Sequence, residues 1–242
     1  MGSLTRLDRG EFLDSYWPGL YQSGQHLLLT GATQRSGKST LGYQLLEAVP
    51  QHVADKQAYC MKPRDRTVAE ATQRMGFREI DNWPPVKYPW QSEPAGYTLW
   101  PKHTFDPDKD NERLKGIFRR AMLDAYKKGD TILFLDEVFG VAELGLQDEL
   151  SSILSRGAGM GTAAWMSVQR GSGTQQVSIP GFVWSQPFHN FIAHSSNKTD
   201  RQKYADMNGD FDPSWIENTV LNLRPYNFLY LNADGDAAII GQ

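Results

Sequence analysis

Short apolar runs alternate along this chain with stretches in which apolar residues recur at helical spacing. Continuous runs of this kind are typical of strands buried on both faces of a parallel sheet. The predicted strands are 26–30, 57–61, 131–135, 163–168 and 188–194. The predicted helices are 41–49, 108–128, 145–156 and 199–207. This alternation predicts an α/β fold with a mostly parallel sheet between two layers of helices.

Two segments depart from the alternation. Residues 227–232 and 237–240 flank a glycine turn and predict an antiparallel hairpin at the edge of the sheet, preceded by a short helix from Asp212. Residues 63–107 interleave prolines with tryptophans and tyrosines, a composition unsuited to helix and too aromatic for disorder. We expect an ordered insertion or a lid there.

Length and composition narrow the class of protein. The 242 residues, 40% hydrophobic and 22% charged, predict a single domain over 1–242. No run approaches the roughly 18 to 20 apolar residues that span a bilayer, and the N-terminus lacks the apolar core of a signal peptide, so we expect a cytoplasmic protein. Cys60 has no internal disulfide partner and lies in an apolar run, which predicts a core position. The net charge of −3 argues against a simple DNA-coating protein.

A phosphate-binding loop follows the first predicted strand. Its sequence, GATQRSGKST, comprises Gly31, Ala32, Thr33, Gln34, Arg35, Ser36, Gly37, Lys38, Ser39 and Thr40. In such a loop backbone N–H groups surround the β-phosphate, Lys38 reaches the β- and γ-oxygens, and the Ser39 hydroxyl binds Mg²⁺. Ala32 stands where the commonest version has glycine, and Arg35 stands where small residues are usual. The motif predicts binding of ATP and Mg²⁺ between a buried strand and a helix N-terminus.

Two carboxylates end the strand at 131–135. Asp136 at this position can hold the Mg²⁺ that bridges the phosphates, and Glu137 can activate the water that attacks the γ-phosphate. The strand at 163–168 ends in Gln169, which either senses the γ-phosphate or merely caps the strand. The acidic pair predicts hydrolysis.

Together, GKS, the apolar run ending in Asp-Glu, and the segment SRGAGMGTAAWMSVQR resemble the FtsK/HerA superfamily of ring-forming DNA motors, over about residues 26–205. The resemblance implies a P-loop NTPase of the RecA/ASCE type. It implies that Lys38 and Ser39 bind nucleotide and Mg²⁺, that Asp136 supports the metal, that Glu137 is the catalytic carboxylate and that Gln169 senses the γ-phosphate. It also implies an arginine that reaches the neighbouring subunit's nucleotide. Arg156 is the first candidate, with Arg170, Arg119 and Arg120 as alternatives.

The resemblance implies a subunit of an ATP-driven translocase that acts on double-stranded DNA as a homo-oligomeric ring, a hexamer or pentamer. The lack of further domains favours a viral genome-packaging or mobile-element motor, which would act in the host cytoplasm if viral. Candidate DNA contacts are Arg170 in the polar loop 170–176 and the basic cluster Lys62, Arg64 and Arg66, although both segments also fit ordinary solvated loops.

Three other functions share part of this pattern. Residues 197–200, NKTD, match the guanine-reading motif of GTPases, or belong to a helix start with a capping box at 199–202. A small-molecule kinase would need a lid over the phosphates, for which residues 76–107 are the candidate, yet an Asp-Glu pair suits water activation better. An ATP-dependent switch or adapter would hydrolyse slowly and move nothing along DNA.

Overall fold

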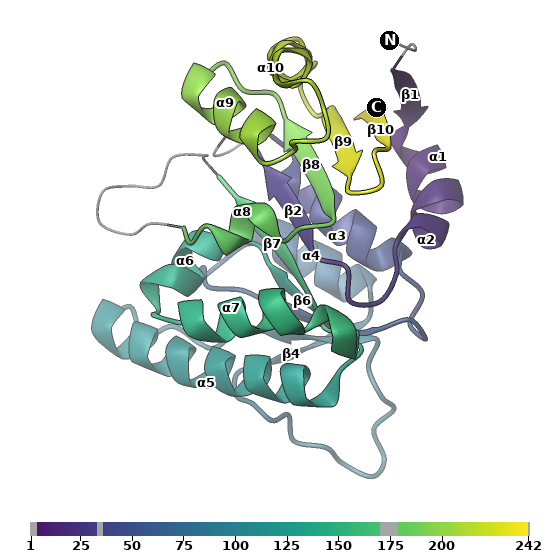
Figure 1. Ribbon diagram of the computed structural model, residues 1–242. Helices are drawn as coiled ribbons and strands as arrows, with labels where there is room; N and C mark the ends of the chain where they lie inside the picture. Colours follow the sequence, from purple (N-terminus) through teal and green to yellow (C-terminus); the bar gives the residue numbers. More distant parts are fainter. Residues whose placement is uncertain (1–3, 33–35, 170–178, 242) are drawn as a thin grey trace.

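A computed structural model describes residues 4–32, 36–169 and 179–241, and these fold into one mixed sheet with helices on both faces (Figure 1). The strand order is β1-β10-β9-β8-β2-β7-β6-β3-β5-β4. The strands are β1 (Thr5–Asp8), β2 (Leu27–Thr30), β3 (Asp55–Tyr59), β4 (Phe77–Ile80), β5 (Gly96–Leu99), β6 (Thr131–Leu135), β7 (Ala163–Val168), β8 (His189–Ala193), β9 (Phe228–Asn232) and β10 (Ala237–Gly241). Only β9 runs antiparallel to its two neighbours among the described pairs. The predicted fold class, a mostly parallel α/β sheet with antiparallel C-terminal strands, is therefore confirmed.

Each face of the sheet carries its own hydrophobic core, because successive side chains of a strand point to opposite faces. On β2, Leu28 packs into one core, and Leu27 and Leu29 pack into the other. The first core is covered by α5 (Pro107–Lys128), α6 (Val138–Glu143), α7 (Gln147–Arg156), α8 (Phe182–Ser185), α9 (Lys198–Asp206) and α10 (Pro213–Leu221). The second is covered by the π-helical turn η1 (Phe12–Tyr16), α2 (Trp17–Leu20), α3 (Lys38–Ala48) and α4 (Arg66–Arg74). In Figure 1, α5 and α7 lie in front of the sheet, and α3 and α4 lie behind it. None of the helices in the described ranges is long and apolar enough to cross a membrane.

The N-terminal segment is part of the core, which the hydrophobic pattern did not predict. β1 pairs in parallel with β10, so the predicted C-terminal hairpin forms but β1 is the strand at the edge. Phe12 and Trp17 are fully buried, and the Trp17 indole Nε1 donates to the Leu45 carbonyl at 3.1 Å. The segment therefore ties the sheet edge to α3.

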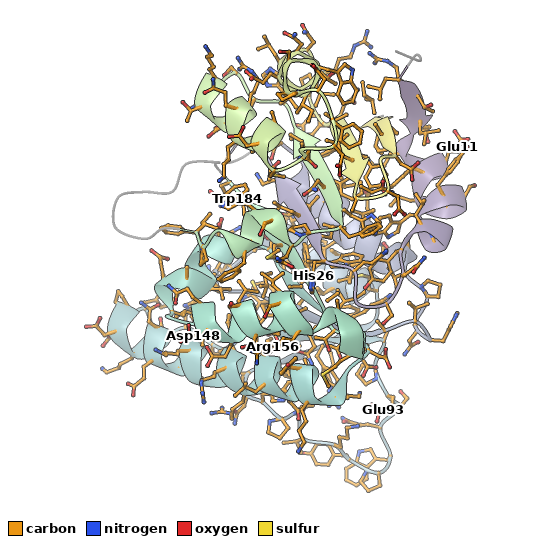
Figure 2. The ribbon with its side chains drawn as sticks, viewed as in Figure 1. Glu11, His26, Glu93, Asp148, Arg156 and Trp184 are labelled. Atoms are coloured by element: carbon orange, nitrogen blue, oxygen red, sulfur yellow. The ribbon has the colours of Figure 1, made fainter. Side chains whose placement is uncertain are left out.

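The segment 63–107 differs from the expected insertion or lid. Residues 66–99 supply α4, β4 and β5, and both strands pair in parallel to extend the main sheet. The connection between β4 and β5 returns to the amino ends of the strands, where Lys87 and Glu93 line a cavity with Asp55 at the start of β3. Glu93 marks this end of the molecule in Figure 2. This connection thus lies at the amino ends of the strands. The phosphate-binding loop lies at their carboxyl ends, so the connection does not cover the loop.

Candidate functional site

The predicted phosphate loop lies between the buried strand β2 and α3, at the carboxyl edge of the sheet. Two of its residues require glycine. Gly31 has φ 152°, and a Cβ there would lie 2.7 Å from the Ala193 Cβ. Gly37 has φ 80°, in the left-handed region, at the N-cap of α3. The expected binding residues Thr33, Gln34 and Arg35 lie outside the described residues, so their contribution stays a prediction.

Lys38 is buried within this loop. Its Nζ donates to the carbonyl oxygens of Gly31 and Ala32, each at 2.8 Å, and to Ser36 Oγ at 3.1 Å. Burial lowers the pKa of Lys38 to about 8, while the nearby carboxylates of Glu137 and Asp136 act in the opposite direction. The ammonium is thus held at the loop, close to the acidic end of β6.

Asp136 has the surroundings expected of a metal-supporting carboxylate. It is buried, and its Oδ1 has no hydrogen-bond partner in the described part of the chain. Burial raises its pKa, and the Ser39 hydroxyl lies close enough to lower it. No three His, Cys, Asp or Glu side chains cluster as a metal site within the described ranges. Ser39 and Asp136 therefore fit Mg²⁺, which is usually held by one or two protein groups together with phosphates and water.

Glu137 and Gln169 contact each other directly. β7 lies between β2 and β6, so Gln169 at its end is placed between the loop and the acidic pair. The Gln169 amide Nε2 donates to Glu137 Oε2. Burial raises the pKa of Glu137 to about 7, from an ordinary 4.5. The amide therefore orients the carboxylate, which goes beyond capping a strand.

Lys38, Asp136 and Gln169 line one cavity of about 420 Å³. This volume lies in the usual range of ligand pockets. The described lining residues are Ser36, Gly37, Lys38, Ser39, Thr40, Lys62, Asp65, Thr67, Asp136, Ser167, Gln169 and Tyr226. The structure thus gathers loop residues 36–40, Asp136 and Gln169 around one space.

Lys62 belongs to this cavity, although its sequence position grouped it with Arg64 and Arg66. Its Nζ lies 3.9 Å from Asp136 Oδ2 and 2.9 Å from Asp65 Oδ2. The sequence contained one indication that Lys62 belongs to the cavity: it follows shortly after the carboxyl end of β3, which pairs with β6. Arg64 is exposed, and the exposed Arg66 pairs with Glu70 at 2.6 Å.

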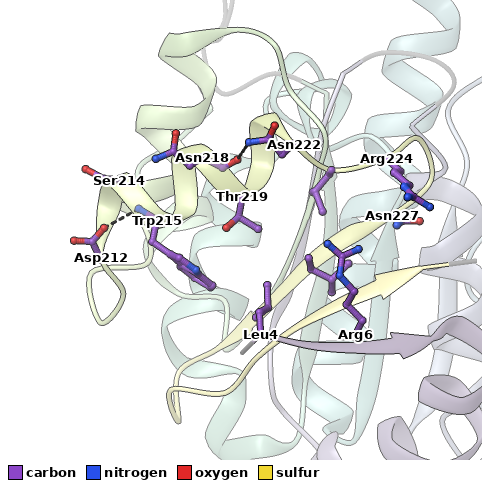
Figure 3. A pocket seen from close by; sticks show the side chains of 12 residues that line it. Leu4, Arg6, Asp212, Ser214, Trp215, Asn218, Thr219, Asn222, Arg224 and Asn227 are labelled. Carbon is purple, nitrogen blue, oxygen red and sulfur yellow. Dashed lines mark hydrogen bonds between the residues drawn. The ribbon is translucent and has the colours of Figure 1, made fainter. Parts of the chain in front are cut away.

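A larger cavity of about 710 Å³ lies elsewhere, between α10 and the β1–β10 edge (Figure 3). Arg6, Trp215 and Arg224 are among its lining residues. No described residue lines both this cavity and the one around Lys38. We therefore identify the cavity around Lys38 as the candidate site by the chemistry of its lining residues and not by its volume.

The candidate trans-acting arginines differ in their engagement. Arg119 pairs with Glu149 at 2.7 Å, and the Arg120 Nε donates to the Trp83 carbonyl at 3.0 Å.

Arg156 is exposed at the end of α7 and makes no hydrogen bond or ion pair with the described part of the chain (Figure 2). The last turn of α7 lies beside the start of β2, since the His26 Nε2 donates to the Leu154 carbonyl at 3.1 Å. Arg156 therefore does not reach the cavity of its own chain. Arg170 and the loop 170–176 lie outside the described residues.

The NKTD segment begins a helix. Asn197 is the N-cap of α9, and its Oδ1 accepts from the Thr199 N–H at 2.9 Å and the Asp200 N–H at 3.3 Å. The capping residue is thus Asn197, two residues before the expected capping box at 199–202, because the asparagine amide already satisfies the free N–H groups.

Comparison with known proteins bears on the fold. No family model matches the chain, and no curated protein matches it. Among solved structures, the genome packaging NTPase B204 from Sulfolobus turreted icosahedral virus 2 in complex with AMPPCP aligns with 89% of this chain and 97% of its own, at 15% identity and a TM-score of 0.57. B204, described as the DNA-packaging ATPase from Sulfolobus turreted icosahedral virus, aligns with 90% and 98% at 15% identity and a TM-score of 0.58. VirB4 of Thermoanaerobacter pseudethanolicus aligns with 89% and 88% at 9% identity and a TM-score of 0.63.

At such low identities a shared structure establishes the fold, and the activity has to be inferred from the site itself. The sequence resemblance is confirmed at the level of the fold: this chain shares the fold of B204 and VirB4.

Proposed function

We propose that this protein is an ATPase that binds ATP with Mg²⁺ in the cavity around Lys38. The observation that carries the proposal is the meeting of three strand ends there. β2 supplies the loop, β6 supplies Asp136 and Glu137, and β7 supplies Gln169. A solved structure with a similar fold, that of the virus 2 B204, holds ATP-gammaS, which supports nucleotide binding here.

The residues divide the reaction among them. The loop amides and Lys38 bind the phosphates. Ser39 with Asp136 would hold Mg²⁺, which would supply positive charge to the phosphate oxygens. Glu137, oriented by Gln169, accepts a proton from the attacking water. Gln169 contacts the general base Glu137. A movement of its amide when the γ-phosphate is lost would therefore displace the end of β7 after hydrolysis.

We further propose that this ATPase is a motor subunit that moves double-stranded DNA, as part of a homo-oligomeric ring in viral genome packaging or mobile-element transfer. Two features support the proposal. The fold is that of B204, a DNA-packaging ATPase. Arg156 is exposed, has no ion pair with the described part of the chain and lies outside the cavity around Lys38, as a trans-acting finger must. In a ring, modest basic clusters such as Arg64 and Arg66 from several subunits would add to one field.

The test is ATP turnover measured against protein concentration, with and without duplex DNA. We expect turnover per subunit to rise with concentration as the ring assembles, and to rise further with DNA. Arg156→Ala should lower turnover by about 1000-fold while ATP binding persists, because a finger acts only in the transition state. Arg119→Ala removes the alternative candidate on the neighbouring helix α5 and tests whether the loss is specific to Arg156.

Other outcomes would assign another function. Turnover that ignores DNA but responds to a protein partner would indicate a switch or adapter, and faster turnover of GTP than of ATP would support the guanine reading of residues 197–200. Arg64→Gln with Arg66→Gln should reduce the DNA stimulation and flatten its salt dependence. Unchanged values would remove this cluster from the DNA contacts.

A further inference from the structure

Tyr226 is an exposed aromatic ring at the phosphate loop. It precedes β9 and is 43% exposed, and it is the one aromatic residue among the described residues that line the cavity. A Cβ built on Gly37 would lie 3.1 Å from the Tyr226 Cδ1, so the ring stands against the backbone of the loop. A ring in this position offers an apolar face to whatever the loop binds.

The backbone of Tyr226 is held in an unfavourable conformation. Its φ is 64°, in the left-handed region that bulky residues rarely adopt. The guanidinium of Arg9 donates to the Tyr226 carbonyl, and the Arg9 Cζ lies 5.8 Å from the centre of the Phe228 ring. Arg9 is only 7% exposed, so a buried charge from the N-terminal segment fixes this turn. Strained backbone kept in place by its surroundings is a common feature of binding sites.

The cavity has two chemically different sides. Lys62, Asp136 and Gln169 follow β3, β6 and β7, which lie on one side of β2. Tyr226 belongs to the β8–β9 side, beyond the loop. The charged groups that act on the γ-phosphate are therefore on the side away from the ring. A nucleotide with its γ-phosphate toward Glu137 extends its other end toward Tyr226.

We infer that the Tyr226 ring is the stacking platform for the nucleobase of the bound triphosphate, and that Arg9 is a positioning residue for this ring. The inference rests on the proposed nucleotide site and adds its base subsite. Stacking uses the π-face that every base has, so the contact supports affinity for nucleotides in general and does not select adenine over guanine.

The test compares a ligand that has a base with one that has none. Isothermal calorimetry with Mg²⁺ would measure the Kd of ATP and of inorganic tripolyphosphate for the wild type, Tyr226→Gly and Tyr226→Phe. Glycine removes the ring and accepts the positive φ, so this variant is expected to fold. Tyr88→Gly, which removes another exposed tyrosine from the opposite edge of the sheet, is the matched control.

We expect Tyr226→Gly to raise the Kd of ATP by about tenfold or more and to leave the Kd of tripolyphosphate unchanged. Tyr226→Phe should bind both ligands like the wild type. Arg9→Leu should weaken ATP selectively, and Arg9→Lys should restore part of the loss. Equal losses for both ligands, or no loss of ATP binding in Tyr226→Gly, would overturn the base platform. In the latter case tripolyphosphate binding by the wild type would still support the phosphate site, whereas its absence would contradict the proposed function itself.

Discussion

Burial sets the ionisation of the charged residues around the cavity. It lowers the pKa of Lys38 to about 8 and raises that of Glu137 to about 7. Each shift disfavours the charge that catalysis needs, since desolvation penalises the ionised form. A base with a pKa near the working pH accepts a proton most effectively. Burial of Glu137 therefore lowers the stability of the folded protein but makes this carboxylate a better general base.

Glu137→Gln should therefore stabilise the folded protein at alkaline pH. The carboxyl group binds its proton more tightly in the folded state, so its contribution to stability falls as the pH rises from 4.5 through about 7. The substitution removes that loss, and we expect a gain of about 3 kcal/mol in the free energy of unfolding near pH 8 and no gain near pH 4. Urea denaturation at both pH values would measure this. Glu143→Gln, at an exposed position of α6, is the control; an equal gain at both pH values would contradict the burial argument.

At the same scale, the sequence predicted the residues that carry a motif and missed those that do not. Lys38, Asp136 and Gln169 follow from their positions after apolar runs. Lys62 and Tyr226 come to the cavity only through the pairing of β3 with β6 and of β9 with β8, which a local pattern does not reveal.

Among the elements, α3 places the phosphate loop through close packing on the sheet. A Cβ at Gly42 would meet the Phe134 ring at 2.5 Å and the Leu29 Cδ1 at 2.9 Å. Any larger side chain would push the helix, and with it Lys38, away from β2 and β6. This glycine therefore sets the distance between helix and sheet.

Gly42→Ala should lower the free energy of unfolding by about 1 to 3 kcal/mol, because overpacking displaces well-packed groups. Gly116→Ala in α5 is the matched control. A Cβ there meets nothing closer than the Arg120 Nη1 at 3.6 Å, so alanine should raise stability by about 0.5 to 1 kcal/mol. Thermal denaturation of both variants would measure the difference. A Gly42→Ala protein as stable as Gly116→Ala would show that α3 can shift without cost.

The elements that the sequence predicted are those with long buried runs. β1 was missed because its residues are largely exposed, and only its pairing with β10 makes it a strand. α4, β4 and β5 were missed because they border a proline- and tryptophan-rich connection, and the composition of the whole segment hid three regular elements within it. Both cases are set by tertiary pairing and not by local propensity.

On the scale of the whole molecule, the strand order brings the chemistry together. Placing β7 between β2 and β6 puts the phosphate loop, the Gln169 amide and the acidic pair side by side at the carboxyl ends of the strands. The end of α7 with Arg156 lies at the amino ends of the strands. One subunit therefore presents its cavity and its candidate finger at opposite ends of its strands. Such an arrangement suits head-to-tail assembly, in which one surface of a subunit meets another surface of the next.

The central claim is that ATP is bound in the cavity around Lys38 and cleaved with Glu137 as the base. Calorimetric ATP binding and phosphate release, measured on the wild type and Glu137→Gln under the same conditions, test it most directly. We predict that the variant binds ATP at least as tightly as the wild type. It should release phosphate at least about 100-fold more slowly, because only the water-activating base is lost. Undiminished phosphate release by Glu137→Gln, or no ATP uptake by the wild type, would contradict it.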